Sequence, residues 1–338
     1  MQHSPTYIKG FGYYVPERVL DNFELSTLVD TSNEWIIERT GIEQRRIVAP
    51  GETCSDMICR AAAQALESSG LQAADITHVL VGTISGDDSF PATAAHVQNK
   101  MGIRGMAFDF AAACASFIYG MQIARGLLAF EPEAKILLAV GEVLSIRTDW
   151  TDRSTCVLFG DAAGAAVLSN DPEEPRTRHP LKGNAVLEGV LCDADGKWVD
   201  LMFCHGGGSS FPYKLGAVVG PENFTRMNGR EIFKHAVRDM LGISRKLMDS
   251  LGCGLEDLDL VVPHQANLRI VRAVTERLGV PREKVVETVQ KYGNTSASSV
   301  ILALGNAMEE GRVKPGSRVL MTAFGSGLTW GSAILRFC

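Results

Sequence analysis

Three polar residues, far apart in the chain, have neighbours that fit a nucleophilic active site. Cys114 lies in DFAAACASF, His264 in VVPHQAN and Asn294 in KYGNTSASS. Cys114 follows a short apolar run and opens a stretch predicted to be helical to about Phe130, which puts its thiol at a helix start. The free N–H groups and the positive dipole end are expected to lower the pKa of that thiol. With a histidine and an asparagine from elsewhere in the chain, such a thiolate is a nucleophile for acyl transfer.

Each of these residues also has a purely structural interpretation. A cysteine is often a small buried hydrophobe, and the chain has eight cysteines. The surroundings favour chemistry instead, because His264 follows an apolar strand and a proline, a context that the other six histidines lack. Asn294 lies in a polar turn just before a predicted helix. Long separations between a nucleophile and its partners are normal, since the fold brings them together.

Composition and charge narrow the class of protein. Hydrophobic residues make up 46% of the 338 residues and charged residues 21%, ordinary values for a chain that buries a sizeable core. The net charge of -6 gives no global basic field for nucleic acid or an anionic membrane. Eight cysteines without a CxxC pair predict a reducing compartment and no metal site. No signal peptide is recognisable and no apolar run reaches roughly 18 residues, so we expect a cytoplasmic protein.

Short apolar strands alternate with amphipathic helical stretches, which predicts an α/β fold. In the first half we expect helices at 55–69 and 92–101, and strands at 77–83, 107–110, 135–141 and 164–168. The segment 169–182 is polar and holds three prolines, so it is expected to be a surface connection. In the second half we expect helices at 229–251, 267–278 and 298–310, and strands at 185–191, 258–262, 317–323 and 331–337.

The three motifs, together with several longer segments in fixed order, resemble β-ketoacyl-acyl-carrier-protein synthase III, which starts bacterial fatty acid synthesis. These segments are VDTSNEWIIERTGIEQRRI (29–47), SFPATAAHVQ (89–98), TDRSTCVLFGDAAGAAVL (151–168) and AFGSGLTWGSAILRF (323–337). The resemblance implies a thiolase-like five-layer αβαβα fold of two related halves. It places the nucleophile in residues 1–178, and the histidine and asparagine in residues 179–338.

The reaction implied is a decarboxylative Claisen condensation. An acyl group passes from a short acyl-CoA primer, acetyl-CoA, to Cys114, and malonyl-acyl-carrier protein then loses CO2 to give an enolate that attacks the acyl-Cys. A neutral imidazole of His264 and the amide of Asn294 are suitable donors to the enolate oxygen. Because an asparagine cannot abstract a proton, the pair indicates condensation without a strong base. No cofactor is expected, since the coenzyme A thioester is itself a substrate.

The turn Gly325-Ser326-Gly327 has two interpretations. Its position between two predicted strands is typical of a hairpin turn. The resemblance adds that the backbone N–H groups of Cys114 and Ser326 form an oxyanion hole. Many relatives have a third glycine at position 326, so the serine matters only if it alters the backbone conformation.

The resemblance also implies a binding site for coenzyme A. Trp35 stacks on the adenine, Arg39 and Arg153 reach its base and phosphate groups, and Asn267 holds the pantetheine arm. Phe324 is implied as a further substrate contact. An indole face and guanidinium groups suit these roles, and the less favoured alternative for the two arginines is surface ion pairing.

An acidic carrier protein would need local positive charge. Lys234 with Arg238, and Arg269 with Arg272, lie on single helix faces, and the resemblance supports Lys234 and Arg269 as carrier-protein contacts. Phe90 matches a residue that crosses a homodimer interface into the partner's acyl tunnel, where a bulky ring favours small primers. Arg230, where many relatives have asparagine, and the stretch 204–216 depart from the family pattern near the expected substrate entrance.

Other functional classes fit less well. The His205-Gly206-Gly207-Gly208 run resembles a lipase oxyanion motif, but the chain has no GxSxG elbow. The 325–327 turn lacks the last glycine of a dinucleotide-binding loop. A thiolase would need a second catalytic cysteine, and elongating synthases use two histidines. The alternatives left open are a related Cys-His-Asn condensing enzyme or acyltransferase of secondary metabolism with another primer, and a scaffold that only binds acyl-carrier protein.

Overall fold

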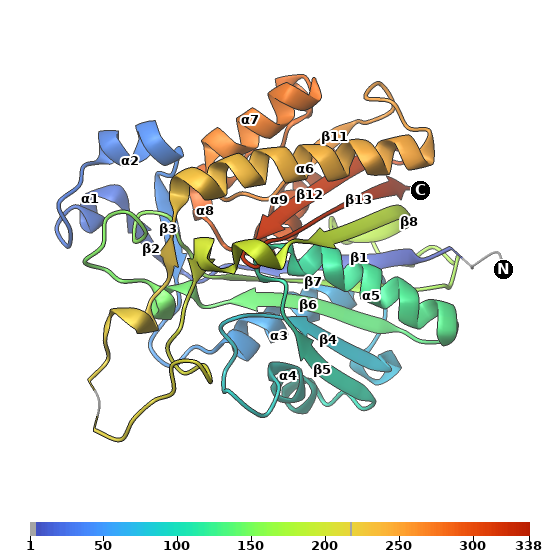
Figure 1. Ribbon diagram of the computed structural model, residues 1–338. Coiled ribbons are helices and arrows are strands. Elements are labelled where there is room, and N and C mark those ends of the chain that lie inside the picture. Colours follow the sequence, from blue (N-terminus) through green and yellow to red (C-terminus); the bar gives the residue numbers. More distant parts are fainter. Residues whose placement is uncertain (1–4, 217) are drawn as a thin grey trace.

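A nine-stranded mixed sheet forms the centre of the molecule (Figure 1). The structure is a computed structural model that describes residues 5–216 and 218–338. Across the sheet the strand order is β11-β12-β13-β8-β1-β7-β6-β4-β5. In chain order these strands are β1 (Tyr7–Tyr14), β4 (His78–Gly82), β5 (Met106–Phe110), β6 (Ile136–Glu142), β7 (Ala162–Ser169), β8 (Lys182–Ala194), β11 (Leu260–Pro263), β12 (Arg318–Gly325) and β13 (Thr329–Phe337).

The sheet consists of strands from two stretches of chain that meet at one seam. Strands β1, β4, β5, β6 and β7 come from the first half of the chain, and β8, β11, β12 and β13 from the second. Antiparallel pairing of β1 with β8 joins the two groups, with Tyr7 opposite Val186. Each group contains parallel neighbours, β4 with β5 and β6, and β11 with β12.

Helices complete a layered arrangement around these strands. Helices α5 (Ser116–Phe130) and α9 (Ser298–Glu309) contact strands of both groups and form the central layer. Helices α3 (Cys54–Ser69) and α4 (Thr93–Met101) cover the first group, whereas α6 (Gly229–Leu251) covers the second with α7 (Leu268–Leu278) beside it (Figure 1). This is the predicted five-layer thiolase-like arrangement, and the fold class is confirmed. The boundary between related halves at residue 178 stays a prediction.

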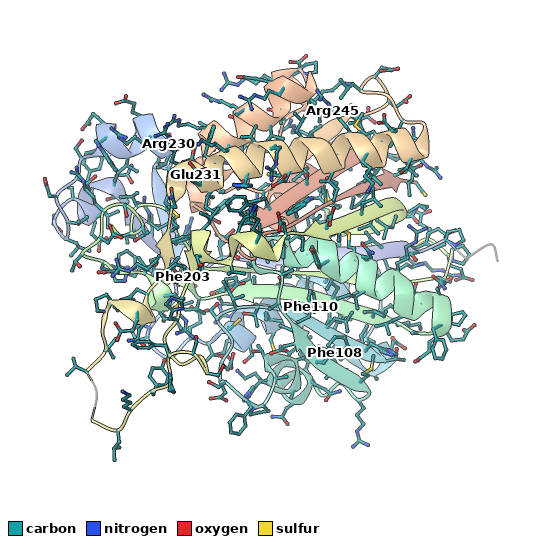
Figure 2. All side chains as sticks on the ribbon, in the orientation of Figure 1. Phe108, Phe110, Phe203, Arg230, Glu231 and Arg245 are labelled. Carbon is teal, nitrogen blue, oxygen red and sulfur yellow. The ribbon has the colours of Figure 1, made fainter. Side chains whose placement is uncertain are left out.

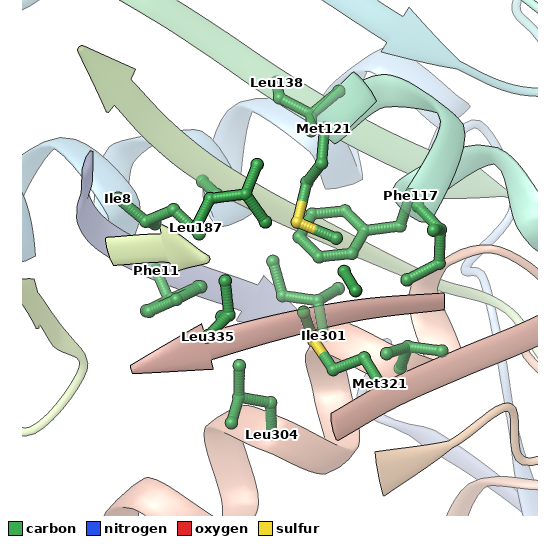
Figure 3. Close-up of a cluster of buried hydrophobic side chains, with 14 of the residues drawn as sticks. Ile8, Phe11, Phe117, Met121, Leu138, Leu187, Ile301, Leu304, Met321 and Leu335 are labelled. Carbon is green, nitrogen blue, oxygen red and sulfur yellow. The ribbon is translucent and has the colours of Figure 1, made fainter. Parts of the chain in front are cut away.

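The largest hydrophobic cluster lies where α5 and α9 meet the sheet (Figure 3). Phe117 and Met121 of α5 pack against the same cluster as Ile301 and Leu304 of α9, and all four are buried. Burying a side chain of this kind contributes about 1.5–3 kcal/mol, so this cluster fixes the two helices that carry site residues at their N-terminal ends.

Helix ends follow local capping chemistry. Helix α3 begins with a capping box in which Thr53 and Asp56 bond reciprocally, and it ends at Gly70 in the left-handed conformation. Helix α6 begins after Asn228, whose side chain accepts from the N–H of Glu231. Its bounds are those predicted, and the other predicted helices and strands are present with ends shifted by a few residues.

Several elements were not predicted from the sequence. The smaller helices and strands are α1 (Asn22–Leu25), α2 (Asn33–Thr40), α8 (Val289–Tyr292), β2 (Arg18–Asp21), β3 (Gln44–Ile47), β9 (Met202–Phe203) and β10 (Arg226–Met227). Short 3-10 helices are η1 (Ala73–Asp75), η2 (Ala113–Ala115), η3 (Leu144–Arg147), η4 (Gly196–Leu201), η5 (Pro221–Asn223) and η6 (Arg282–Lys284). The predicted surface connection holds, since the chain between β7 and β8 has no regular element.

One expectation about membranes needs correction. The stretch Ala113–Phe130 is long and apolar enough to span a bilayer by length and composition, with a mean hydropathy of 1.3 over 18 residues. It is the helix of the central layer, and 56% of it is buried inside the structure. A helix covered by sheet on two sides is apolar around most of its surface, which explains the high hydropathy.

Candidate active site

The three predicted active-site residues converge on one cavity of about 680 Å³. Cys114, His264 and Asn294 all line it, although they come from different elements and each is buried. The cavity is also lined by the predicted binding residues Trp35, Arg39, Lys234, Asn267, Arg269 and Phe324. The fold thus brings together residues that are far apart in the sequence.

Cys114 lies in the short helix η2, directly before α5, as the strand–turn–helix pattern predicts. Gly325 passes so close that a Cβ there would lie 2.7 Å from the Cys114 backbone nitrogen, so only glycine fits this approach. The expected lowering of the thiol pKa is wrong for the unliganded protein. Burial raises the pKa of Cys114 to about 12 and outweighs the hydrogen bonds from Ser296 and the backbone that favour the thiolate.

His264 follows β11, and its backbone N–H donates to the Thr322 carbonyl at 2.8 Å. Its Nδ1 lies 2.6 Å from the hydroxyl oxygen of Ser299 on α9. That oxygen also accepts from the Gln265 N–H at 3.2 Å. Burial lowers the pKa of His264 to about 3, so the ring is neutral near pH 7.

Asn294 is held by its backbone and by its side-chain oxygen. Its N–H donates to the Leu158 carbonyl at 2.8 Å, and its carbonyl accepts from the Gly160 N–H at 3.0 Å. Its Oδ1 accepts from the Ser296 N–H at 2.9 Å. Because the oxygen is engaged within the loop, the amide NH2 is the part of the side chain that can act as a donor.

A second cavity, of about 390 Å³, shares Cys114 with the first. Ser326 lines this cavity and lies in the turn between β12 and β13, so the hairpin interpretation is confirmed. The Ser326 hydroxyl donates to the Met202 carbonyl. Cys204 and Gly206, from the stretch that departs from the family pattern, line the same cavity.

Trp35 and two arginines form a compact group at the mouth of the larger cavity. The guanidinium carbons of Arg39 and Arg153 lie 4.8 and 5.1 Å from the Trp35 ring centroid. Arg153 also donates to the Asp30 carbonyl at 3.0 Å and is not among the residues that line the cavity. Asn267 caps α7 and donates to the Arg39 carbonyl at 3.2 Å, which links this group to the histidine loop.

The basic residues of the predicted patch differ in their partners and in their place relative to the cavity. Arg238 pairs with Asp239 and Arg272 with Glu287, at 2.7 and 3.3 Å, so both are partly neutralised. Lys234 pairs with Glu231, and the Arg269 guanidinium lies 5.8 Å from the ring centroid of Phe233; both residues still line the cavity. Arg230 lines the cavity too, as expected for a residue near the entrance, and lies with Glu231 at the N-terminal end of α6 (Figure 2).

Phe90 lies outside both cavities, in the segment before α4, and is 87% exposed. In the single chain it closes no tunnel. Its predicted role needs a second copy of the chain and stays a prediction.

Sequence reasoning missed the residues that hold the triad. Ser299 contacts the His264 ring, Ser296 contacts Cys114 and Asn294, and Gln265 fixes the histidine loop with four side-chain hydrogen bonds. The NTSASS run gave no distinguishing signal for the two serines, because hydroxyl residues are common at helix starts.

Comparison with known proteins decides the family. The family model "3-Oxoacyl-[acyl-carrier-protein (ACP)] synthase III" matches residues 108–180, and its C-terminal counterpart matches residues 248–337. The β-ketoacyl-[acyl-carrier-protein] synthase III of Nitratidesulfovibrio vulgaris (strain Hildenborough) is 50% identical over 335 residues, 99% of each chain. The chain belongs to the β-ketoacyl-[acyl-carrier-protein] synthase III family.

Solved structures agree with this family assignment. The 3-oxoacyl-[acyl-carrier-protein] synthase III from Aquifex aeolicus VF5 has a TM-score of 0.87 and 40% identity, covering 98% of this chain and 100% of that one. The priming β-ketosynthase of the R1128 polyketide pathway has a TM-score of 0.88 and 32% identity, covering 99% and 97%. As a synthase III, the chain is an acyltransferase-type condensing enzyme of fatty acid biosynthesis, and the predicted function is confirmed at this level.

Proposed function

We propose that Cys114, His264 and Asn294 perform a decarboxylative Claisen condensation between a short acyl-CoA, acetyl-CoA, and malonyl-acyl-carrier protein. The observation that carries the proposal is that the three side chains line a single cavity, whose mouth holds Trp35 and Arg39. Nucleophile, donors and an aromatic platform are the parts that the reaction needs.

In the first half-reaction the Cys114 sulfur attacks the thioester carbon and coenzyme A leaves. The developing oxyanion takes hydrogen bonds from the backbone N–H groups of Cys114 and Ser326. Both residues line the second cavity, and Gly325, the last residue of β12, lets the two backbones approach closely. A backbone donor of this type contributes about 2.7–4 kcal/mol to the transition state.

In the second half-reaction malonyl-acyl-carrier protein loses CO2 and the enolate attacks the acyl-Cys carbonyl. The neutral His264 ring and the Asn294 amide donate to the enolate oxygen. Ser299 supports this role, because an oxygen that accepts from the Gln265 N–H can give its own proton to Nδ1 and leave Nε2 protonated. Neither donor changes charge during the step.

Binding residues complete the site. Trp35 stacks on the adenine of coenzyme A, Arg39 and Arg153 bind its base and phosphates, and Asn267 and Phe324 contact the pantetheine arm. Lys234 and Arg269 meet the acidic carrier protein at the mouth of the cavity, joined there by Arg230. The support is that all of these except Arg153 line the cavity, while Arg153 stacks on Trp35.

The same proposal covers assembly and location. The enzyme is a soluble cytoplasmic homodimer without a resident cofactor, in which Phe90 enters the partner's acyl tunnel and limits primer length. Exposure of Phe90 in the single chain supports this arrangement. The two related halves are residues 1–178 and 179–338. A priming synthase with another acyl group is the second candidate, because Cys204 and Gly206 of the 204–216 stretch line the cavity beside Cys114.

Purified protein incubated with acetyl-CoA and malonyl-acyl-carrier protein tests the function. The expected result is acetoacetyl-carrier protein with one CO2 released per product. If no acyl-CoA yields a β-ketoacyl product while malonyl-carrier protein is bound, the scaffold interpretation replaces the condensing one. If product forms only with primers other than acetyl-CoA, the second candidate is the right one.

A further inference from the structure

A fully buried carboxyl group lies close to the nucleophile but has no part in the reaction described so far. Glu142 is the last residue of β6 and is inaccessible to solvent. Its carboxylate accepts from the Ser85 hydroxyl, from Thr83 Oγ1 at 3.4 Å and from the Ile84 N–H at 3.3 Å. None of the ion pairs in the described part of the chain includes Glu142. Burying a carboxyl group without a nearby cation costs free energy, and hydroxyl partners offset only part of that cost. Glu142 is therefore a candidate for a functional role.

Ser296 connects this carboxyl group to the nucleophile. Its hydroxyl donates to Glu142 Oε1 at 3.4 Å, and Ser296 lines the smaller cavity together with Cys114, whose pKa it acts to lower. The serine is 1% exposed and has a φ of +50°, a conformation in which its N–H donates to Asn294 Oδ1. The Ser296 hydroxyl thus has the Glu142 carboxylate as its acceptor and Cys114 as a neighbour in the cavity.

The geometry points to a proton path from Cys114 through the Ser296 hydroxyl to Glu142, and this inference rests on the proposed acyl transfer to Cys114. As the sulfur bonds to the thioester carbon, its proton moves to the Ser296 oxygen and the Ser296 proton moves to Glu142 Oε1. The bond between the carbonyl carbon and the coenzyme A sulfur then breaks. The departing thiolate takes a proton from water and Glu142 returns one to water, so the net transfer releases no proton.

His264 is the alternative proton acceptor within the triad, but its pKa is less suited to accepting the proton of Cys114. Burial raises the pKa of Glu142 to about 7 and lowers that of His264 to about 3. The Cys114 thiol, with a pKa of about 12, is therefore closer in acidity to Glu142 than to the imidazole. Proton transfer is most efficient when the acceptor titrates near the working pH.

Few other ionisable groups face Glu142. Across β6, the thiol of Cys54 on α3 lies 3.7 Å from Thr83 Oγ1, and burial raises its pKa well above the usual value. The carboxyl groups of Asp87 and Asp109 lie near Cys54 and act on its pKa in the same direction. From the nucleophile side the facing group is Cys114 itself. The path thus joins Glu142 to the group that loses a proton in the proposed acyl transfer.

The pH dependence of Cys114 acylation tests the path. In single-turnover reactions with acetyl-CoA and no malonyl donor, the wild-type rate should rise through about pH 7 and then level, because Glu142 accepts a proton only when ionised. Glu142→Gln should lose this rise and react about 100-fold more slowly at pH 8. Cys54→Ala, which removes the neighbouring thiol but not the path, should keep the rise.

Ser296→Ala gives an independent test, because it leaves Glu142 and its other donors in place and serves even if Glu142→Gln does not fold. It should also lose the rise near pH 7. The rate at which iodoacetamide alkylates Cys114, followed by peptide mass spectrometry, measures the same rise near pH 7 without coenzyme A. If no protein is acylated but alkylation of wild type shows the rise near pH 7 and both variants lack it, the proposed function fails and the path stands. If Glu142→Gln lowers the rate equally at every pH and keeps the rise, the carboxyl group is structural and the path is refuted.

Discussion

The reaction centre has an acyl side, which contains Cys114, and a donor side, which contains His264 and Asn294. Burial shifts the pKa values of Cys114 and His264 in opposite directions. On the acyl side, burial raises the pKa of Cys114 to about 12, and on the donor side it lowers that of His264 to about 3. Both groups are thus neutral near pH 7, and the site holds no preformed thiolate–imidazolium pair. The acyl side must lose a proton to react, whereas the donor side only donates hydrogen bonds. We therefore expect acyl transfer and decarboxylation to depend on different residues.

The largest effect is expected on the acyl side. Cys114→Ser replaces the thiol by a hydroxyl of much lower acidity, so acylation and condensation should fall by about 10⁴-fold or more. The measurement is the rate of β-ketoacyl product formation under saturating substrates. Cys156→Ser, which changes a buried cysteine away from the cavities, is the matched control and should retain activity. Substantial activity in Cys114→Ser would remove the thiol from the mechanism.

A smaller and more selective effect is expected on the donor side. His264→Ala and Asn294→Ala should each slow decarboxylation of malonyl-carrier protein by about 10²–10³-fold, the usual contribution of one donor in a dry site. Both variants should still acylate Cys114, because the oxyanion donors of that step are backbone groups. The two rates are measured separately, as CO2 release and as acyl-enzyme formation. Decarboxylation at the wild-type rate would show that the residue has another role.

Binding of coenzyme A at the mouth of the larger cavity should contribute less to the rate than the acyl side or the donor side. Trp35→Ala removes the aromatic face between two guanidinium groups, and KM for acetyl-CoA should rise about three- to tenfold with little change in kcat. Arg238→Ala, which changes a residue paired with Asp239 outside the cavity, is the control and should leave KM for acetyl-CoA unaltered. An unchanged KM in Trp35→Ala would place the adenine elsewhere.

The effect on primer length is the smallest when it is taken per methylene group of the acyl chain. Phe90→Ala should shift preference toward longer acyl-CoA chains by about fourfold per added methylene, since each buried CH2 contributes about 0.8 kcal/mol. A panel of primers from two to eight carbons, compared by kcat/KM, measures this shift. Wild-type preference for octanoyl-CoA or longer primers would contradict the short-primer proposal, and the 204–216 stretch would then be the first segment to exchange.

Much of the difference between the acyl side and the donor side could be predicted from the sequence. The features that could not be predicted were missed for physical reasons. The positions of Cys114 and His264 after strands were visible, because short motifs at strand ends are local features, whereas Asn294 follows the short helix α8 and not a strand. The pKa of the thiol was predicted in the wrong direction, since the helix start is local but burial depends on packing from both halves. β1 was missed, because the glycines in YIKGFGYY interrupt the apolar pattern of a central strand.

Supporting residues were equally hard to predict. Glu142 is the last residue of an apolar strand. Its proposed role depends on the hydroxyl groups of Thr83, Ser85 and Ser296, which lie near it only in the folded protein. Ser299 likewise contacts the His264 ring from a different element. Side chains of this kind carry no local signature, whereas nucleophiles at helix starts do.

The acyl-enzyme itself tests the separation of the two sides most directly. Wild type, His264→Ala and Asn294→Ala are each incubated with acetyl-CoA alone, digested and mapped by peptide mass spectrometry. We predict one acetyl group per chain, on the peptide that contains Cys114, in all three proteins. Acetylation of another of the eight cysteines, or no acetylation in the two variants, would contradict the account.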